Sequence, residues 1–394
     1  MQAIEQSPAQ ASPDTGTIIS PAQIGISIEV VAYAVLLLFA LCVHIADLDT
    51  VPLSDLEAMQ ALPAWHMLYP DAPGTALTSD SPVTFWLQAI GLTMLGGNEF
   101  AARLPGLLGG MLLVLLPLLF RQRIGQERAF LWTLLLVCSP IVLLSGRFTQ
   151  PAIWNSVFAL LGIWAVWRYI ESRTQRDMLL AGAAFTGLVF LSGAGGVILA
   201  ILLALSALLA VLWTAYSQPE DLELETPGQN IIAQAQSLIA SIAFTQVAML
   251  AFLLIFVVST GFMLHPSGLS MVGEVFAGAL TGITQPAQPG TAFGSGLWGV
   301  FFYNPLLIVM TLVTAITFLR RERLAFFERF LFVWMLLAAL MLLLYRGAIA
   351  GDALWFVLPA TALFTGLLRD IVEDRRVFMF WLDDTPSADD DNLP

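Results

Sequence analysis

The sequence predicts an all-α protein that crosses a membrane several times. Of its 394 residues, 58% are hydrophobic and only 11% are charged, whereas a soluble domain carries about 25% charged residues. Its mean hydropathy is +0.82. The apolar runs approach the roughly 20 residues of a spanning helix and are apolar on every face, whereas the strands of a membrane barrel would alternate over roughly 10 residues. These observations favour helices.

Successive apolar runs predict about ten spans. One run, 178–215, is long enough for two passes, and the cluster Ser192–Gly196 (Ser-Gly-Ala-Gly-Gly) supplies a tight reversal between them. Residues 83–97 follow a proline and are short for a span, so we expect a helix at the membrane surface. The predicted spans are 25–44, 104–120, 129–146, 152–169, 178–194, 197–215, 241–263, 297–319, 330–346 and 354–368.

Polar segments divide the chain into two membrane modules. Residues 1–24 contain no Lys or Arg, unlike the start of a cleavable signal peptide, so the first apolar run is expected to stay as an anchor. Acidic stretches at 220–225 and 383–391 hold much of the net charge of −13 and argue against a nucleic-acid partner. We therefore expect a disordered tail 1–24, an N-terminal module 25–215 with first outer loop 45–103, an acidic cytoplasmic linker 216–240, a C-terminal module 241–368 with outer loop 264–296, and an acidic cytoplasmic tail 369–394.

The basic residues predict the orientation. The chain has no lysine, and 13 of its 16 basic residues fall in loops on one side, which the positive-inside rule assigns to the cytoplasm. Both termini are then cytoplasmic, in a multi-pass protein of the cell membrane. The inner arginines are Arg121, Arg123, Arg128, Arg168, Arg173, Arg176, Arg320, Arg321, Arg323, Arg329, Arg369, Arg375 and Arg376.

Three arginines, Arg103, Arg147 and Arg346, fall instead where a helix meets the outer face. Each can extend its guanidinium to the lipid headgroups. Together they are also a candidate cluster for binding a phosphate, which a guanidinium binds with two parallel hydrogen bonds. The sequence leaves both interpretations open.

The first outer loop contains the candidate catalytic groups. Asp55 and Glu57 follow the first span, where Ser54 or Asp55 could cap a short helix running to about Leu62. A carboxylate at the mouth of a membrane cavity can also serve as the general base of a transfer reaction. A third option is a divalent metal ion held by Asp55 and Glu57 with His66, although His66 is more often a structural residue in such a position.

Several motifs resemble one family. The stretch Ser81–Leu87 reads Ser-Pro-Val-Thr-Phe-Trp-Leu, and Leu95–Pro105 reads Leu-Gly-Gly-Asn-Glu-Phe-Ala-Ala-Arg-Leu-Pro. With the acidic pair before them, the passage Ser139–Phe148 and the later Gly351–Trp355, they are similar to the GT-C membrane glycosyltransferases, in the protein mannosyltransferase and aminoarabinose transferase branch. The resemblance covers about residues 25–200 well and 297–368 more loosely.

The resemblance implies a transferase that moves a sugar from a polyprenyl-phosphate carrier in the membrane to an acceptor on the outer side. It implies Asp55 as catalytic base, Glu57 as its acidic partner, and Arg103 and Arg147 as ligands of the carrier phosphate. We add Arg346 to the phosphate ligands, and His66, Gln150 and Asp352 as candidate contacts to donor or acceptor. A divalent metal is an open option, and no other cofactor is expected.

Two departures from the family pattern keep a second function open. Gln150 stands where relatives often carry an aspartate, and Ser192-Gly193 stands where they often carry a lysine. These changes favour a catalytically inactive relative that binds lipid carriers or partner proteins in a membrane assembly. A transporter is less favoured, because it would need ionisable residues in mid-span and the predicted spans hold almost none.

Overall fold

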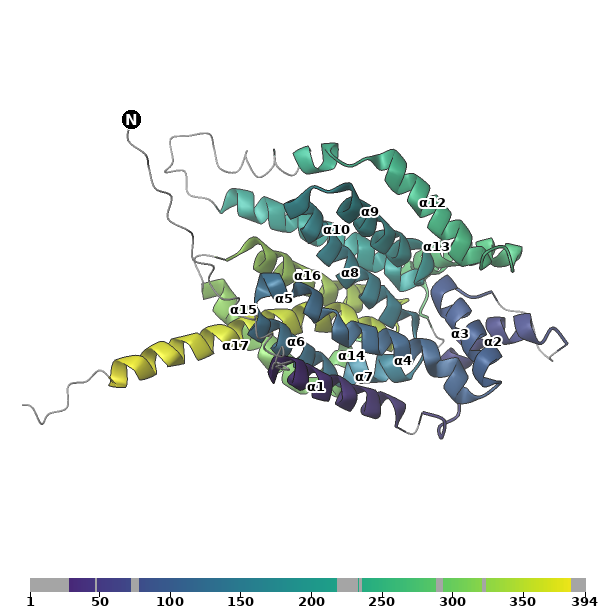
Figure 1. Ribbon diagram of the computed structural model, residues 1–394, viewed down its shortest axis with the longest axis horizontal. Coiled ribbons are helices and arrows are strands. Elements are labelled where there is room, and N and C mark those ends of the chain that lie inside the picture. Colours follow the sequence, from purple (N-terminus) through teal and green to yellow (C-terminus); the bar gives the residue numbers. More distant parts are fainter. Residues whose placement is uncertain are drawn as a thin grey trace, which may run out of the picture.

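The computed structural model describes residues 28–46, 48–71, 78–217, 233, 236–287, 293–320 and 324–383, and within these ranges all regular structure is helical. The predicted tail 1–24 lies outside the described residues, as do most of the linker 216–240 and the last part of the tail 369–394. The all-α prediction is confirmed. Figure 1 shows most helices running side by side along the molecule, with α2 and α3 together at its right-hand end.

The N-terminal part forms a series of helices joined by short turns. A π-helical turn (Gly187–Leu191) follows α9, and Gly193 then reverses the chain into α10 with a φ of 126°. The helices are α1 (Ile28–Ile45), α2 (Asp55–Leu68), α3 (Pro82–Leu95), α4 (Glu99–Leu115), α5 (Pro117–Ile124), α6 (Gln126–Val137), α7 (Pro140–Arg147), α8 (Pro151–Ser172), α9 (Gln175–Thr186) and α10 (Ala194–Tyr216).

The C-terminal part adds longer helices and two 3₁₀ turns, Pro266–Gly268 and Ala350–Ala353. Helix α16 packs against both α10 and α17, so the two halves of the chain share one core. The helices are α12 (Phe244–Thr260), α13 (Leu269–Thr284), α14 (Ser295–Tyr303), α15 (Pro305–Arg320), α16 (Phe326–Leu344) and α17 (Leu354–Asp383).

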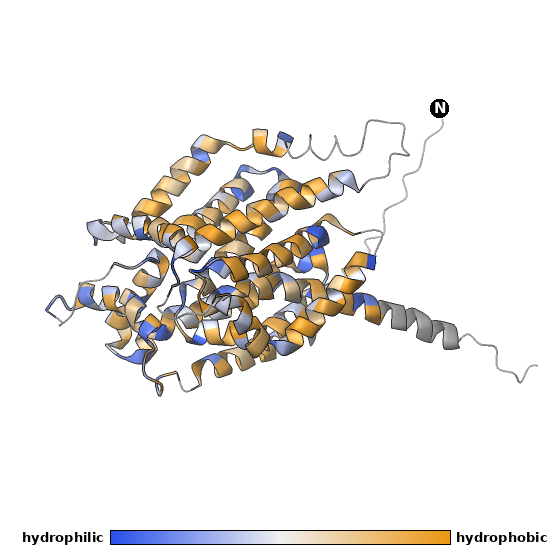
Figure 2. Cartoon of the chain, turned by 180° about the vertical axis from the view of Figure 1, so that it is seen from behind, coloured by the Kyte–Doolittle hydropathy of each residue, from blue (hydrophilic) through white to orange (hydrophobic). Residues whose placement is uncertain are grey.

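Within the described residues, five helices are long and apolar enough to cross a membrane, or seven if each of two bent pairs is one span. The prediction of a multi-pass membrane protein is confirmed, but the count of about ten spans is not. Three further apolar helices, including the predicted surface helix α3, are shorter than that limit. Figure 2 shows hydrophobic residues along the helices and hydrophilic residues gathered at helix ends and in loops. The five long spans are Glu99–Ile124, Pro151–Ser172, Ala194–Tyr216, Phe326–Leu344 and Ala350–Val372.

Two predicted spans are broken rather than straight, which corrects the sequence analysis. The span predicted at 129–146 consists of α6 and α7, which meet at 62°, and the span predicted at 297–319 consists of α14 and α15, which meet at 99°. A proline begins the second helix of each pair and disfavours helical backbone in the residue before it. Asn304 at one break donates through Nδ2 to Ser139 Oγ at the other, 3.2 Å away, so the two breaks lie together.

The core is filled by large side chains between α6, α16 and α17. Trp132, Trp334 and Trp355 are the largest fully buried side chains. Because lipid tails are as apolar as the core itself, packing and hydrogen bonds between helices carry much of the stability of such a bundle. Trp132 provides one of these bonds, because its Nε1 donates to Thr361 Oγ1 on α17 at 3.1 Å.

Candidate functional site

The acidic pair of the first outer loop begins helix α2, where Ser54 is the N-cap. The Ser54 side chain accepts from the Glu57 N–H, and Glu57 Oε2 accepts from the Ser54 N–H at 2.9 Å, which is a complete capping box. The helix was expected to end near Leu62 but continues through Pro63 to Leu68. Pro63 is buried, and the next residue, Ala64, belongs to a small buried cluster around Phe85, so packing in this part of α2 offsets the hydrogen bond that the proline removes.

Glu57 and Arg103 form a buried ion pair between α2 and α4. Arg103 Nε lies 2.7 Å from Glu57 Oε1, and Nη2 lies 3.1 Å from Oε2. The remaining guanidinium N–H groups donate to the carbonyls of Leu48, Val51 and Pro52 at 2.6, 2.8 and 3.1 Å. All five donors of the guanidinium therefore have acceptors: two on Glu57 of α2 and three in the loop before α2.

The ion pair also determines the protonation state of Glu57. Burial raises the pKa of this carboxyl, but hydrogen bonds from Arg103 and Ser54 more than offset the effect, so the pKa of Glu57 lies below its usual range. Glu57 is therefore a fixed carboxylate with both oxygens bonded. A general base needs an oxygen that can accept a proton from substrate, and Glu57 has none directed to open space.

The three outer arginines contact different elements. Arg147 donates to the carbonyls of Val43 and Ala46 at the C-terminal end of α1, at 3.2 and 2.6 Å. Arg346 is exposed and donates to the Thr284 carbonyl at the end of α13, at 3.3 Å. Arg103 and Arg147 therefore both bind carbonyls at or just after the end of α1, whereas Arg346 bonds at the end of α13, so the described hydrogen bonds do not join the three arginines into one cluster.

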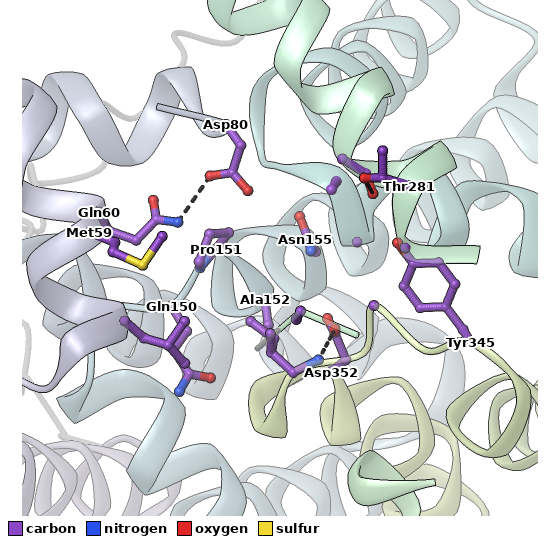
Figure 3. Close-up of a pocket in the computed structure, with 18 of the residues that line it drawn as sticks. Met59, Gln60, Asp80, Gln150, Pro151, Ala152, Asn155, Thr281, Tyr345 and Asp352 are labelled. Carbon is purple, nitrogen blue, oxygen red and sulfur yellow. Dashed lines mark hydrogen bonds between the residues drawn. The ribbon is translucent and has the colours of Figure 1, made fainter. Parts of the chain in front are cut away.

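A cavity of about 290 Å³ lies between α2, α8, α10, α13 and the turn before α17. Its lining combines polar side chains with the backbone of several glycines, and none of its described lining residues is basic. Figure 3 shows Asp80, Asn155, Thr281, Tyr345, Gln150 and Asp352 arranged around it. The lining residues are Leu56, Met59, Gln60, Asp80, Thr149, Gln150, Pro151, Ala152, Asn155, Ala194, Gly195, Gly278, Thr281, Gly282, Gln285, Pro286, Ala287, Tyr345, Gly347, Ile349 and Asp352.

Asp352 is the most deeply buried acid of this cavity, with 3% of its side chain exposed. One oxygen, Oδ2, accepts from the Ile349 N–H at 2.9 Å, whereas Oδ1 has no hydrogen-bond partner among the described residues. Oδ1 lies so close to Gly195 that a Cβ atom there would be only 2.9 Å away. Gly195 therefore lets the carboxylate approach the start of α10, and one oxygen is held while the other is unpaired.

Asp80 is the second acid of the cavity and was missed by the sequence analysis. Its Oδ1 accepts from Gln60 Nε2 of α2 at 3.0 Å (Figure 3). Burial raises the pKa of the Tyr345 phenol, and the carboxyl groups of Asp352 and Asp80 raise it further, so this phenol remains protonated. One sequence feature could have identified Asp80 as a site residue: it directly precedes Ser81-Pro82, where the motif that resembles the family begins.

Hydrogen bonds hold the starts of α8 and α10 beside the cavity. Asn155 of α8 is 1% exposed, and with its amide oriented to match its neighbours it donates to Ser192 Oγ at 2.7 Å and accepts from the Gly196 N–H at 3.2 Å. Ser81 donates to the Ser192 carbonyl at 3.0 Å. Pro151 has no N–H and the Gly196 N–H is bonded, so the first donors left at these two helix starts are the N–H groups of Ala152, Ala194 and Gly195, at the positive ends of the helix dipoles.

The structure brings only some of the predicted site residues into the cavity. Gln150 and Asp352 line it, whereas Glu57 and His66 do not. Asp55 is exposed at the start of α2, one turn before Met59, which does line the cavity, so Asp55 lies toward its rim. Among the described residues, no group of three His, Cys, Asp or Glu side chains could hold a metal ion, so the trio Asp55, Glu57 and His66 is not assembled as one.

Comparison with known proteins assigns this architecture to a class. The fold is similar to that of ArnT from Cupriavidus metallidurans in the apo state, with a TM-score of 0.57 and 16% identity over 86% of this chain and 60% of ArnT. ArnT bound to undecaprenyl phosphate gives the same TM-score at 15% identity, again over 86% of this chain and 60% of ArnT. The oligosaccharyltransferase AglB from Archaeoglobus fulgidus, in complex with an inhibitory peptide and a dolichol-phosphate, gives 0.52 at 16% identity over 93% of this chain and 52% of AglB.

The chain therefore has the GT-C fold of membrane glycosyltransferases, as its motifs predicted. More particularly, residues 79–220 match the family described as dolichyl-phosphate-mannose-protein mannosyltransferase. No curated protein sequence matches the chain significantly. The chain spans 60% of the length of ArnT and about half of AglB, so the likeness defines the fold of the membrane region and leaves the activity to be argued from the site.

Proposed function

We propose that this protein is a glycosyltransferase that moves a sugar from a polyprenyl-phosphate-linked donor to an acceptor in the cavity at the α2 and α3 end of the bundle. The GT-C fold supports this class of reaction. The observation that carries the proposal is Asp352, a buried carboxylate with one oxygen held by backbone and the other unpaired at the cavity.

In the proposed reaction, an acceptor oxygen or nitrogen attacks the anomeric carbon while the bond from that carbon to the carrier phosphate breaks. The phosphate leaves with the bonding electron pair, and the proton of the acceptor passes to a carboxylate. Asp352 Oδ1 is suited to receive this proton because it has no other partner. Asp55, the base expected from the family resemblance, lies toward the rim and is the second candidate.

The negative charge of the departing phosphate needs stabilisation. Arg103 and Arg147 are bonded to backbone carbonyls, so the proposed donors are the N–H groups of Ala152, Ala194 and Gly195, which line the cavity at the starts of α8 and α10, together with Arg346 near the rim. Arg346 directly follows Tyr345, which lines the cavity, and it uses one described hydrogen bond. We also propose that this end faces outward and that both termini are cytoplasmic, as the arginine distribution predicts.

The test is a transfer assay with purified protein in lipid and a panel of radiolabelled polyprenyl-phosphate sugars. We expect Asp352→Asn to lower turnover by about 10²–10⁴-fold, the usual contribution of a general base. Asp49→Asn, at an exposed loop position outside the cavity lining, is the matched control and should leave turnover unchanged. Retention of full activity by Asp352→Asn, with loss in Asp55→Asn, would move the base to the rim.

A catalytically inactive carrier-binding protein is the second candidate, and one observation favours it. The described lining of the cavity contains no basic side chain, although the substrate would bring a phosphate. Such a protein would bind polyprenyl phosphate and release no labelled product with any donor of the panel. Binding that weakens in Arg346→Ala, combined with no turnover in wild type, would establish this alternative.

A further inference from the structure

Two arginines are buried among the described residues, Arg103 and Arg329, and they differ in their partners. Arg103 uses all five of its N–H donors. Arg329, near the start of α16, is 9% exposed, and its Nε and Nη1 have no hydrogen-bond partner among the described residues. A buried charge without a partner is strongly destabilising. The contrast indicates that the partner of Arg329 is an anion outside the described residues.

The described neighbours of Arg329 do not supply this partner. Its guanidinium carbon lies 5.7 Å from the ring centre of Trp213 on α10. Such a contact uses the face of the guanidinium, whereas the N–H donors lie in its plane. The adjacent carboxylate, Glu328, pairs with Arg128 at 3.5 Å, and none of the described ion pairs includes Arg329. The in-plane donors of Arg329 therefore remain available.

The start of α16 adds backbone donors at the same place. No described side chain caps this helix, whose N-cap is Ala325, so its first N–H groups lack a capping acceptor. Helical side chains lean toward the N-terminus, and Arg329, in the fourth position, therefore lies beside this end. Ala325 and Phe326 are exposed, so the first turn is open to a ligand. A positive helix end beside an arginine is suited to a phosphate.

This end of α16 lies far from the polar cavity. Arg329 precedes Tyr345, which lines that cavity, by sixteen residues, or about 24 Å along the helix. In the orientation proposed above, this end faces the cytoplasm. Anionic lipids are enriched in the cytoplasmic leaflet, and basic sites between helices on that side bind lipid headgroups. The location therefore favours the phosphate of a lipid headgroup.

We propose that Arg329 and the start of α16 bind the headgroup phosphate of an anionic phospholipid of the inner leaflet. The site belongs to the first turns of a helix long and apolar enough to cross the membrane, which is the depth of a headgroup. The exposed Phe326 provides apolar surface for the acyl chains beside it. Phosphate oxygens accept from the in-plane donors, while Trp213 covers the guanidinium face. This inference is independent of the transfer reaction.

The test compares Arg329→Gln with Arg176→Gln, which removes an exposed arginine of α9 and is the matched control. Delipidated protein is titrated with phosphatidylglycerol, and bound lipid is counted by native mass spectrometry. We expect Arg329→Gln to weaken phosphatidylglycerol binding by about tenfold or more, the usual effect of losing a hydrogen bond to a charged group, and Arg176→Gln to leave it unchanged. Arg329→Lys, which keeps the charge without the planar fork, should retain part of the affinity.

Thermal unfolding in nanodiscs gives a second readout. Because Arg329→Gln removes an unpaired buried charge, it should be at least as stable as wild type in pure phosphatidylcholine. Adding phosphatidylglycerol should raise the unfolding temperature of wild type and of Arg176→Gln but not that of Arg329→Gln. Equal phosphatidylglycerol affinity in wild type and Arg329→Gln would overturn the proposal.

Two further arms separate other sources of the anion. A rise in unfolding temperature with inorganic phosphate in pure phosphatidylcholine, equal to that with phosphatidylglycerol and lost in Arg329→Gln, would replace the lipid by a soluble anion. The acidic segment 220–225 lies outside the described residues and follows α10 in the sequence. Phosphatidylglycerol binding that appears only after Glu220, Asp221, Glu223 and Glu225 are all replaced by Gln would assign Arg329 to that segment and overturn the lipid site.

Discussion

The first outer loop and the cavity use their carboxylates in opposite ways. In the loop, Glu57 has both oxygens bonded by Arg103 and Ser54, and the guanidinium has no free donor. In the cavity, Asp352 has one bonded oxygen and one unpaired oxygen. Buried polar groups are almost always hydrogen-bonded, so the unpaired oxygen of Asp352 needs a partner from outside the described residues, which a water or a substrate can provide. The fully hydrogen-bonded pair of Glu57 and Arg103 therefore supports the fold. Asp352, which has an unpaired oxygen, is the better candidate for a catalytic residue.

The largest expected effect on stability comes from breaking the ion pair. Arg103→Ala leaves Glu57 buried without its partner, and such a loss costs about 3–5 kcal/mol of folding free energy. We expect a strong decrease of the unfolding temperature in detergent. Arg103→Lys should restore part of the lost stability, because lysine restores the charge but has only three N–H donors for the five hydrogen bonds that arginine makes. An Arg103→Lys protein that is as stable as wild type yet fails to bind donor would return Arg103 to the role of phosphate ligand.

The opposite result is expected at Asp352. Asp352→Asn keeps the size of the side chain and an oxygen that can accept from the Ile349 N–H, so the unfolding temperature should change little while turnover falls. Glu57→Gln should instead lower the unfolding temperature, with a loss of turnover only in proportion to the loss of folded protein. Parallel measurement of both quantities distinguishes a catalytic acid from a structural one. Equal losses of stability in the two variants would remove the contrast between the regions.

A smaller effect is expected at Arg147. This residue donates to two carbonyls at the end of α1, where a cation also faces the negative end of the helix dipole. Arg147→Ala should therefore cost about 0.3–1 kcal/mol of stability. Donor KM should stay within twofold of wild type in the transfer assay. A much larger rise of KM in a protein of unchanged stability would show that Arg147 leaves α1 to bind the carrier.

The sequence predicted the fold class and the start of α2 better than it predicted the site or the end of α2. Hydropathy, the Ser54 cap and the GT-C motifs were sufficient for these, because they depend on local chemistry. The breaks at Ser139 and Asn304 were missed, since an apolar run reads the same whether it is straight or bent. Asp80 and the bonding of Arg103 were missed because each depends on contacts with distant residues: Gln60 for Asp80, and the carbonyl oxygens of Leu48, Val51 and Pro52 for Arg103.

The smallest expected effect is the pH dependence of the ion pair. The folded-state pKa of Glu57 lies below its unfolded value, so the pair contributes its full stability above the unfolded pKa and loses it as pH falls through the folded pKa. Wild type should therefore lose more stability than Glu57→Gln as the pH falls from neutral to below about 4.3, the ordinary Glu pKa, with most of the difference below that pH. Thermal unfolding of both proteins across this range measures the difference. Parallel curves would show that Glu57 titrates as an ordinary exposed carboxyl, and the distinction between the bonded loop and the unpaired cavity acid would then lose its electrostatic basis.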